Sequence, residues 1–175
     1  YIADSDEVPD DSTITAPTGW TLVRRDLETG LNGGMGQAVY YKVAGAAEPA
    51  NYQWSFGRSA GILADSQAYS GVDTAMPIAA HGGQINGSST SVTAPSIATA
   101  VANVLLVGVF GSKSLSTFTP PVGMTEVVDV NTANRSIALE VANNHFAGPG
   151  ATGTRVATAT FAAVSIGQLV ALKGN

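Results

Sequence analysis

The serine motif Gly57–Gly61 is the part of this sequence with the most obvious potential for chemistry. Its residues, Gly-Arg-Ser-Ala-Gly, match the G-x-S-x-G pattern of the nucleophile elbow, and two aspartates and His145 follow Ser59 in the chain order of a hydrolase triad. A helix must leave such a serine, but the segment Ile62–Tyr69 has no helical periodicity. We therefore interpret the motif as a glycine-rich turn, and we expect no catalytic residue and no enzyme activity.

An acidic loop, Asp4–Asp11, is the second candidate. It carries five of the thirteen acidic residues of the chain, and carboxylate oxygens are the ligands that Ca²⁺ prefers. The spacing is not that of an EF-hand, because Val8-Pro9 stands where an Asp/Asn-Gly pair is needed. A solvated loop is the favoured interpretation, with calcium held by Asp4–Asp11 as the alternative. We expect no cofactor.

The remaining titratable residues suggest no site. His81 and His145 have no second histidine or cysteine at a spacing typical of metal ligands. Glu48, Glu126 and Glu140 are spaced like ordinary surface acids. The sequence therefore predicts no zinc site, and it singles out no catalytic pair of carboxylates, although such a pair is defined by separation in space rather than in sequence.

Composition narrows the class of protein. Charged residues make up only 12 % of the 175-residue chain, hydrophobic residues 45 %, and the net charge is −5. A nucleic-acid binder needs a basic surface to neutralise phosphates, so we expect no nucleic-acid partner. No run of about 20 apolar residues predicts a membrane span. Without cysteine, disulfides and thiolate metal sites are excluded.

The hydrophobic periodicity is that of β-strands. Tyr52, Trp54 and Phe56 alternate with polar residues, and no long stretch has an apolar stripe at a 3.6-residue period. We expect these three rings to point into a core, while Tyr40 and Lys42 face solvent. Tyr40 is then the aromatic residue best placed to stack on a ligand.

Short strands between proline and glycine turns predict an all-β fold. Turn signals recur every ~8–12 residues, as in antiparallel sandwiches. The expected strands are Trp20–Asp26, Val39–Val43, Tyr52–Phe56, Ile62–Tyr69, Ser89–Thr93, Val104–Phe110, Thr125–Val130, Ser136–Ala142, Thr154–Thr160 and Ser165–Lys173. We predict an antiparallel β-sandwich of the jelly-roll or immunoglobulin-like kind.

The second half of the sequence repeats the first. Thr15–Val23 (TAPTGWTLV) is echoed by Thr119–Val127 (TPPVGMTEV), with proline, glycine and threonine in register. We expect two β-modules, residues 1–80 and 81–175, packed as two similar units or as one. The turn of the second copy follows the apolar run Val104–Phe110, whereas the corresponding run of the first copy is reduced to Tyr1-Ile2-Ala3. We therefore expect a truncated N-terminal strand.

A truncated strand has a consequence for assembly. A sheet that lacks an edge strand exposes unpaired backbone N–H and C=O groups, and a segment of a neighbouring chain can pair with them. We predict an assembly edge at Tyr1, Ile2 and Ala3, filled by self-association or by a partner chain.

Several segments together resemble a β-sandwich module of secreted and phage-associated bacterial proteins. They are Ala16–Val23 (APTGWTLV), Val39–Ala44 (VYYKVA), Glu48–Phe56 (EPANYQWSF), Ala68–Thr74 (AYSGVDT) and Gly150–Thr154 (GATGT). The resemblance spans nearly the whole chain, and AYSGVDT is its most specific part. It implies a non-catalytic module, appended to extracellular enzymes, surface proteins or virion components, and brings no catalytic residues.

These observations favour a non-enzymatic structural or assembly protein, such as a filament, fibre or decoration subunit. Its expected location is extracellular or on a virion surface. The alternative is a carbohydrate-binding or adhesive module of a secreted surface protein, for which a glycan would be the partner and Tyr40 the candidate contact.

Overall fold

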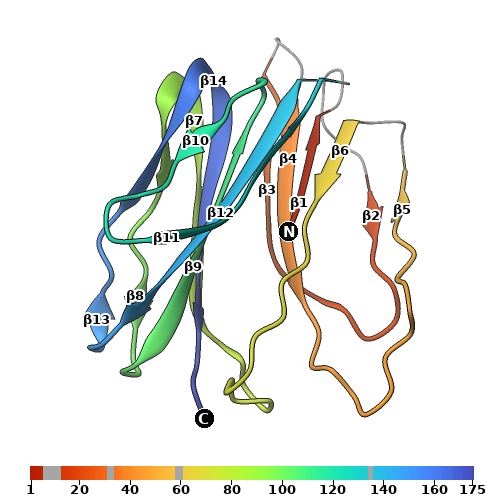
Figure 1. Ribbon diagram of the computed structural model, residues 1–175, viewed down its shortest axis with the longest axis vertical. Coiled ribbons are helices and arrows are strands. Elements are labelled where there is room, and N and C mark those ends of the chain that lie inside the picture. The colour runs from red at the N-terminus through yellow and green to blue at the C-terminus, as the bar shows by residue number, and fades with distance from the viewer. Residues whose placement is uncertain (6–12, 31–33, 58–60, 134–135) are drawn as a thin grey trace.

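The computed structural model describes residues 1–5, 13–30, 34–57, 61–133 and 136–175 of the chain. These residues form antiparallel β-sheets and no helix, which confirms the predicted all-β class (Figure 1). Accordingly, the described ranges contain no helix that could cross a membrane.

Fourteen strands occur in the described residues. They are β1 (Ile2–Ser5), β2 (Ile14–Thr15), β3 (Thr21–Glu28), β4 (Met35–Tyr41), β5 (Ser55–Phe56), β6 (Gly61–Ala64), β7 (Ile78–Ala94), β8 (Ala98–Thr99), β9 (Val104–Ser112), β10 (Phe118–Thr119), β11 (Thr125–Thr132), β12 (Ile137–Phe146), β13 (Gly150–Ala151) and β14 (Arg155–Leu172). Strand β14 joins the two strands that were expected at Thr154–Thr160 and Ser165–Lys173. Strand β6 covers only the beginning of the strand expected at Ile62–Tyr69.

A six-stranded sheet forms the middle of the molecule. Its strand order is β10-β14-β9-β12-β11, and β7 pairs with β14. The inner strands are buried on both faces: in β9, for example, Val109 and Phe110 point to opposite faces and both are fully buried. This explains why Val104–Phe110 is an uninterrupted apolar run rather than an alternating one.

Each face of this sheet packs against its own hydrophobic core. The inter-sheet core consists of Ala3, Met35, Val39, Val107, Val109, Ile137, Leu139, Val141, Ile166 and Val170. The outer core consists of Val92, Ala94, Ile97, Val104, Leu106, Phe110, Phe118, Met124, Ala138, Ala142, Ala157, Ala159, Leu169 and Ala171. The inter-sheet core lies against a second, four-stranded sheet of order β3-β4-β1-β6 (Figure 1). Such face-to-face packing is consistent with a β-sandwich.

Two glutamines join the two sheets through buried hydrogen bonds. The Gln168 amide donates to the carboxylate of Asp26 at 2.7 Å and to the backbone oxygen of Gln37 at 3.0 Å. In return, the Gln37 amide donates to the backbone oxygen of Val109 at 3.1 Å. Because the surroundings are apolar, these directional bonds fix how one sheet is aligned on the other.

The strand order repeats between the two halves. The order β3-β4-β1-β6 corresponds to β11-β12-β9-β14, and the pair β2–β5 corresponds to β10 paired with the first part of β14. The same turn leads into β3 in the first copy and into β11 in the second, closed by a backbone hydrogen bond of 3.2 Å to Pro17 or 2.9 Å to Pro121. Gly19 and Gly123 have φ angles of 88° and 79°, as the third position of a type II turn requires.

The structure corrects the expected assembly edge at Tyr1, Ile2 and Ala3. Strand β1 is an inner strand, because β4 pairs with one of its sides and β6 with the other. Ile2 is aligned with Ala38 of β4 and Ala64 of β6 and is only 4 % exposed. The position beside β1 is filled by β6 of the same chain.

The expected module boundary between residues 80 and 81 falls inside β7, which continues across it. The inter-sheet core contains residues from both sides of that boundary.

Tyr52, Trp54 and Phe56 lie outside both cores, contrary to the expectation that they fill one. All three are half-buried. Trp20 contacts Tyr52 and Trp54 edge-on, with ring centroids 5.2 and 5.4 Å apart. Burial alternates along this segment as predicted, with these three residues half-buried and residues 51, 53, 55 and 57 exposed, but Tyr52 and Trp54 pack on other aromatic rings instead of entering a core.

Substitution of Gly167 by alanine should destabilise the fold, because β7 passes close to this position of β14. An added Cβ would lie 2.3 Å from the backbone oxygen of Thr93, and backbone cannot move aside cheaply. We expect a loss of about 2–3 kcal/mol in the free energy of unfolding, measured by urea denaturation. Gly87→Ala is the matched control, since nothing lies within 4 Å of its added Cβ. Equal stability of the two variants would contradict this packing.

Candidate functional site

A cavity of about 560 Å³ opens beside the inter-sheet core. Its floor is aliphatic and includes Val39, Val107 and Val170. One wall comes from β4 and the loop after it, and the other from residues 65–74, which follow β6. The cavity is therefore built by segments that are far apart in the sequence.

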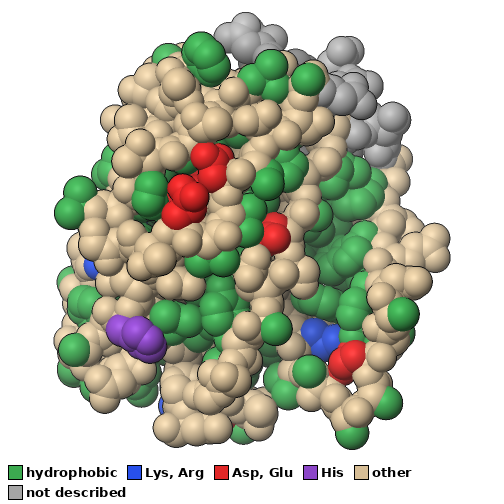
Figure 2. All heavy atoms as spheres, in the orientation of Figure 1, with side chains coloured by type: hydrophobic (Ala, Val, Ile, Leu, Met, Phe, Trp, Pro, Cys, Tyr) green, Lys and Arg blue, Asp and Glu red, His purple; other side chains and the backbone are tan. Residues whose placement is uncertain are grey.

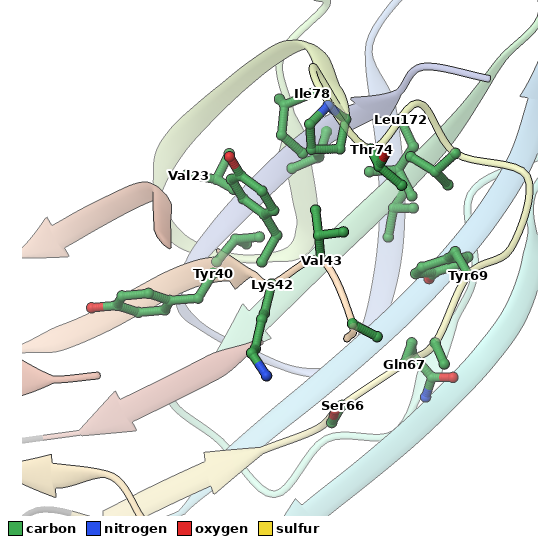
Figure 3. Close-up of a pocket in the computed structure, with 18 of the residues that line it drawn as sticks. Val23, Tyr40, Lys42, Val43, Ser66, Gln67, Tyr69, Thr74, Ile78 and Leu172 are labelled. Atoms are coloured by element: carbon green, nitrogen blue, oxygen red, sulfur yellow. The ribbon is translucent and has the colours of Figure 1, made fainter. Parts of the chain in front are cut away.

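Polar and aromatic side chains face one another across this cavity. Figure 3 shows Ser66, Gln67 and Tyr69 on one wall, with Lys42 and Val43 on the other. The hydroxyl groups and the amide can form hydrogen bonds, whereas the ring of Tyr69 offers a flat apolar surface.

Alternation along β4 decides which tyrosine faces the inter-sheet side. Val39 belongs to the inter-sheet core, so Tyr41, two residues later, points to the same side of the strand. Tyr40 points to the opposite side, where its ring packs against Trp54 at 4.9 Å. It is half-buried rather than exposed, and it still borders the cavity.

Residues 65–74 are held rigidly in place. Gly71 has a φ of 72°, and Val72 forms a β-bridge with Gly174. The Asp73 backbone N–H donates to the Lys173 oxygen at 2.9 Å, and the Lys173 ammonium donates to the Asp73 carboxylate at 2.5 Å. The hydrogen bond from Lys173 lowers the pKa of Asp73. The AYSGVDT segment is thus a fixed wall of the cavity.

The opposite rim contains a second internal charge pair. The Lys42 ammonium donates to the carboxylate of Glu48 and, at 2.8 Å, to the hydroxyl of Tyr52. The hydrogen bond from Lys42, followed by that from the Gly45 backbone N–H, lowers the pKa of Glu48. Lys42 and Glu48 therefore neutralise each other at the rim.

The other candidates from the sequence do not form a site within the described residues. Ser59 and residues 6–11 of the acidic loop Asp4–Asp11 lie outside those residues. His81 and His145 are exposed, on β7 and β12. In the described part of the chain, the group of three potential metal ligands is Glu126, Asp129 and Glu140. It includes neither histidine.

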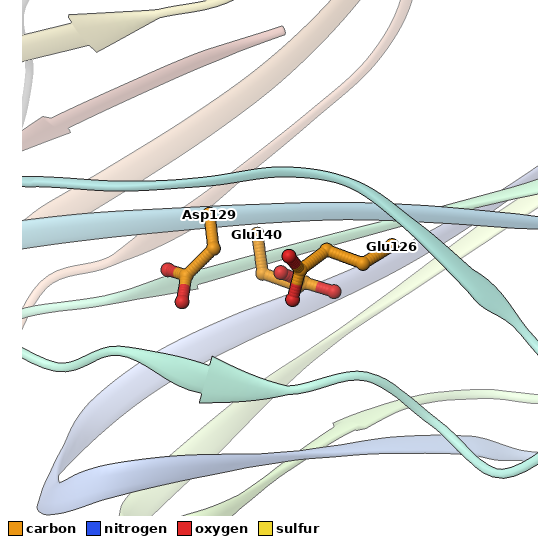
Figure 4. A group of neighbouring side chains, drawn as sticks. All are labelled: Glu126, Asp129 and Glu140. Atoms are coloured by element: carbon orange, nitrogen blue, oxygen red, sulfur yellow. The ribbon is translucent and has the colours of Figure 1, made fainter.

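A second candidate site is the carboxylate cluster, formed by Glu126, Asp129 and Glu140 (Figure 4). Asp129 in β11 is aligned with Glu140 in β12. In a regular strand Glu126 and Asp129 would point to opposite faces, but a β-bulge at Val127 shifts the alternation and brings both to the Glu140 side. One carboxylate oxygen from each residue lies within 4.8 Å of the others.

Glu140 is the unusual member of the carboxylate cluster. It is 0 % exposed, it is aligned with Phe110 of the outer core, and neither of its carboxylate oxygens has a hydrogen-bond partner among the described residues. Burial, and then the charges of Glu126 and Asp129, raise the pKa of Glu140 to about 8. Asp129 is better satisfied, because one of its oxygens accepts a 2.9 Å bond from the Phe118 backbone N–H.

The interpretation of Glu140 as an ordinary surface acid is therefore wrong, whereas Glu126 is indeed exposed. Comparison of the two copies of the internal repeat identifies the carboxylate cluster. The pairing of β3 with β4 places Leu22, Arg25 and Ala38 at the corresponding positions of the first copy. The acids are thus a property of the second copy alone.

Comparison with known proteins adds no relative to this description. No family model, no curated protein and no solved structure matches the chain.

The buried carboxyl of Glu140 should make stability depend on pH. Its pKa is raised from 4.5 to about 8, so between these values the folded protein retains a proton that the unfolded chain releases. Stability is therefore lost as the pH rises from 4.5 to about 8, by roughly 3–5 kcal/mol in all. We expect urea denaturation with a chelator present to show this loss in the native protein and its absence in Glu140→Gln. Parallel pH profiles for the two proteins would contradict it.

Proposed function

We propose that the protein is a non-enzymatic, extracellular binding module that holds a short uncharged saccharide in the cavity beside the inter-sheet core. The composition of that cavity carries the proposal. Saccharide rings present C–H faces that pack on aromatic rings, and hydroxyl groups that need donors and acceptors. An aliphatic floor, with tyrosine rings, hydroxyl groups and an amide on its walls, suits both requirements.

The charges around the cavity favour an uncharged ligand. Lys42 is paired with Glu48, and Asp73 with Lys173. Asp65 accepts a 2.8 Å hydrogen bond from the Gln67 amide. A charged ligand would have to compete with these internal partners, whereas a neutral polyhydroxylated one can use them as donors and acceptors.

The size and rigidity of the cavity agree with this function. About 560 Å³ lies within the range of roughly 300–1,000 Å³ that is typical of small-ligand sites. Residues 71–73 of this wall are held by backbone hydrogen bonds to the C-terminal segment, which limits the ordering that binding requires there.

A panel of neutral oligosaccharides tests the proposal. We expect isothermal titration to show binding of at least one member, such as a β-glucan, xylan, mannan or chitin hexasaccharide. Tyr41→Ala and Tyr69→Ala should each weaken that binding about tenfold or more, because each removes a ring that borders the cavity. Tyr40→Ala tests the aromatic contact predicted from the sequence.

Phe161→Ala is the matched control, because Phe161 is an aromatic residue that is 58 % exposed and does not border the cavity. It should bind the saccharide like the native protein. Thermal melting of each variant shows that it is folded. If no oligosaccharide of the panel binds, or if the Tyr41 and Tyr69 variants bind like the Phe161 variant, the proposed function is wrong.

Structural assembly is the second candidate function, with β11 in place of β1 as the contact. This strand ends its sheet and exposes Val127 and Val130, at 37 % and 39 %. A terminal strand can pair with another chain. If β11 mediates assembly, we expect light scattering to show oligomers whose size increases with protein concentration. Val130→Lys should reduce the size of these oligomers. A native protein that stays monomeric at 200 µM would exclude self-assembly through β11.

A further inference from the structure

We infer that the carboxylate cluster of Glu126, Asp129 and Glu140 binds a calcium ion that ties β11 to β12. The inference is independent of the saccharide proposal, because the two sites lie on different faces of the six-stranded sheet. Glu140 is on the side of the outer core, whereas the cavity floor is part of the inter-sheet core.

The spacing of the carboxylates suits a shared ion. One oxygen from each residue lies within 4.8 Å of the others. Two oxygens that bind the same Ca²⁺ at about 2.3–2.6 Å can be up to about 5 Å apart. Magnesium binds at about 2.1 Å and demands near-ideal octahedral geometry, whereas Ca²⁺ accepts irregular coordination by carboxylates and water. The oxygen-only donor set likewise favours a hard cation over zinc.

The buried carboxylate of Glu140 points to a ligand in its own right. Exposed acids often cluster without binding anything, but Glu140 is 0 % exposed, and both of its oxygens are unpartnered among the described residues. One oxygen of Asp129 is also buried without a partner. A bare buried carboxylate beside two further acids is costly, and a divalent cation supplies both the missing charge and the missing partner.

The ion pairs seen among the described residues do not supply that partner. They include Arg24–Asp26, Lys42–Glu48 and Lys173–Asp73, and none of these three involves the carboxylate cluster. Acidic side chains also adjoin one another on the face of the molecule that carries β10 and β11 (Figure 2). Solvent can reach the site there, because Glu126 is exposed, and water can complete the coordination sphere.

An ion at this position would be structural. It would join β11 to β12 through Asp129 and Glu140, and it would reach β10 through the bond from the Phe118 backbone N–H to Asp129. With only three carboxylates the expected affinity is moderate, with a Kd of about 10⁻⁵–10⁻³ M.

Titration of the chelator-treated, full-length chain with CaCl₂ at pH 8 tests this site. We expect one ion per chain by calorimetry and a melting temperature that rises with calcium concentration. Magnesium at the same concentration should have a smaller effect. Glu140→Gln and Asp129→Asn should each weaken calcium binding at least tenfold and abolish the rise in melting temperature.

Glu28→Gln is the matched control, because it removes one carboxylate outside the cluster, whose oxygen accepts a 2.8 Å bond from the Gly30 backbone N–H. It should bind calcium like the native protein. Without calcium, Glu140→Gln should melt no lower than the native protein, so that lost binding is not lost folding. Absence of calcium binding at 5 mM would overturn the inference. Binding that is unchanged in Glu140→Gln would also overturn it, by placing the ion elsewhere.

Discussion

The structure depends on a central sheet that must be covered on both faces. Strand β9 is apolar on both sides, and Val109 and Phe110, which point in opposite directions, are both fully buried. If neighbours covered only one face, the other apolar face would lie in water. This would cost about 25 cal/mol of folding free energy for each Å² of exposed apolar surface. The four-stranded sheet therefore covers one face, and β10 and the first part of β14 border the core on the other. Gly111 in β9 leaves room for the four-stranded sheet to pack closely on the six-stranded one, since an added Cβ would lie 2.2 Å from the Gln37 side chain.

Features encoded by local sequence were predictable. The turns at Pro17 and Pro121 follow from proline and glycine at fixed positions, and the double-sided burial of β9 follows from an unbroken apolar run. The packing partners of Trp54 were not, because its ring contacts Trp20 and Tyr40, which come from other segments of the chain. Nor was the inner position of β1, because β6 reaches it from some sixty residues later in the chain. Such pairings depend on which strands meet, and periodicity contains no information about that.

The duplication shows how one strand arrangement accommodates different interiors. The aligned strands place Ile2 of the first copy where the second has Phe110, and the matching turns place Trp20 where the second has Met124. Large aromatic residues fill the outer side of the four-stranded sheet, whereas the outer core of the second copy is made mostly of small residues around Phe110. The backbone pattern is set by turns, pairing and bulges, so side-chain volume can be redistributed without altering the strand order.

The shared β-bulge presents different side chains on the same face in the two copies. It lies at Val23 in β3 and at Val127 in β11, and in both strands it turns residues on either side of it toward the same face. In the first copy one of those residues is the apolar Leu22; in the second copy both are acids, and they meet a third acid, Glu140. A buried acid without a partner opposes folding, so packing alone gives no reason for this set of residues. A ligand that binds the three carboxylates together does, because its binding energy is gained only when the bulge and the β11–β12 pairing are formed.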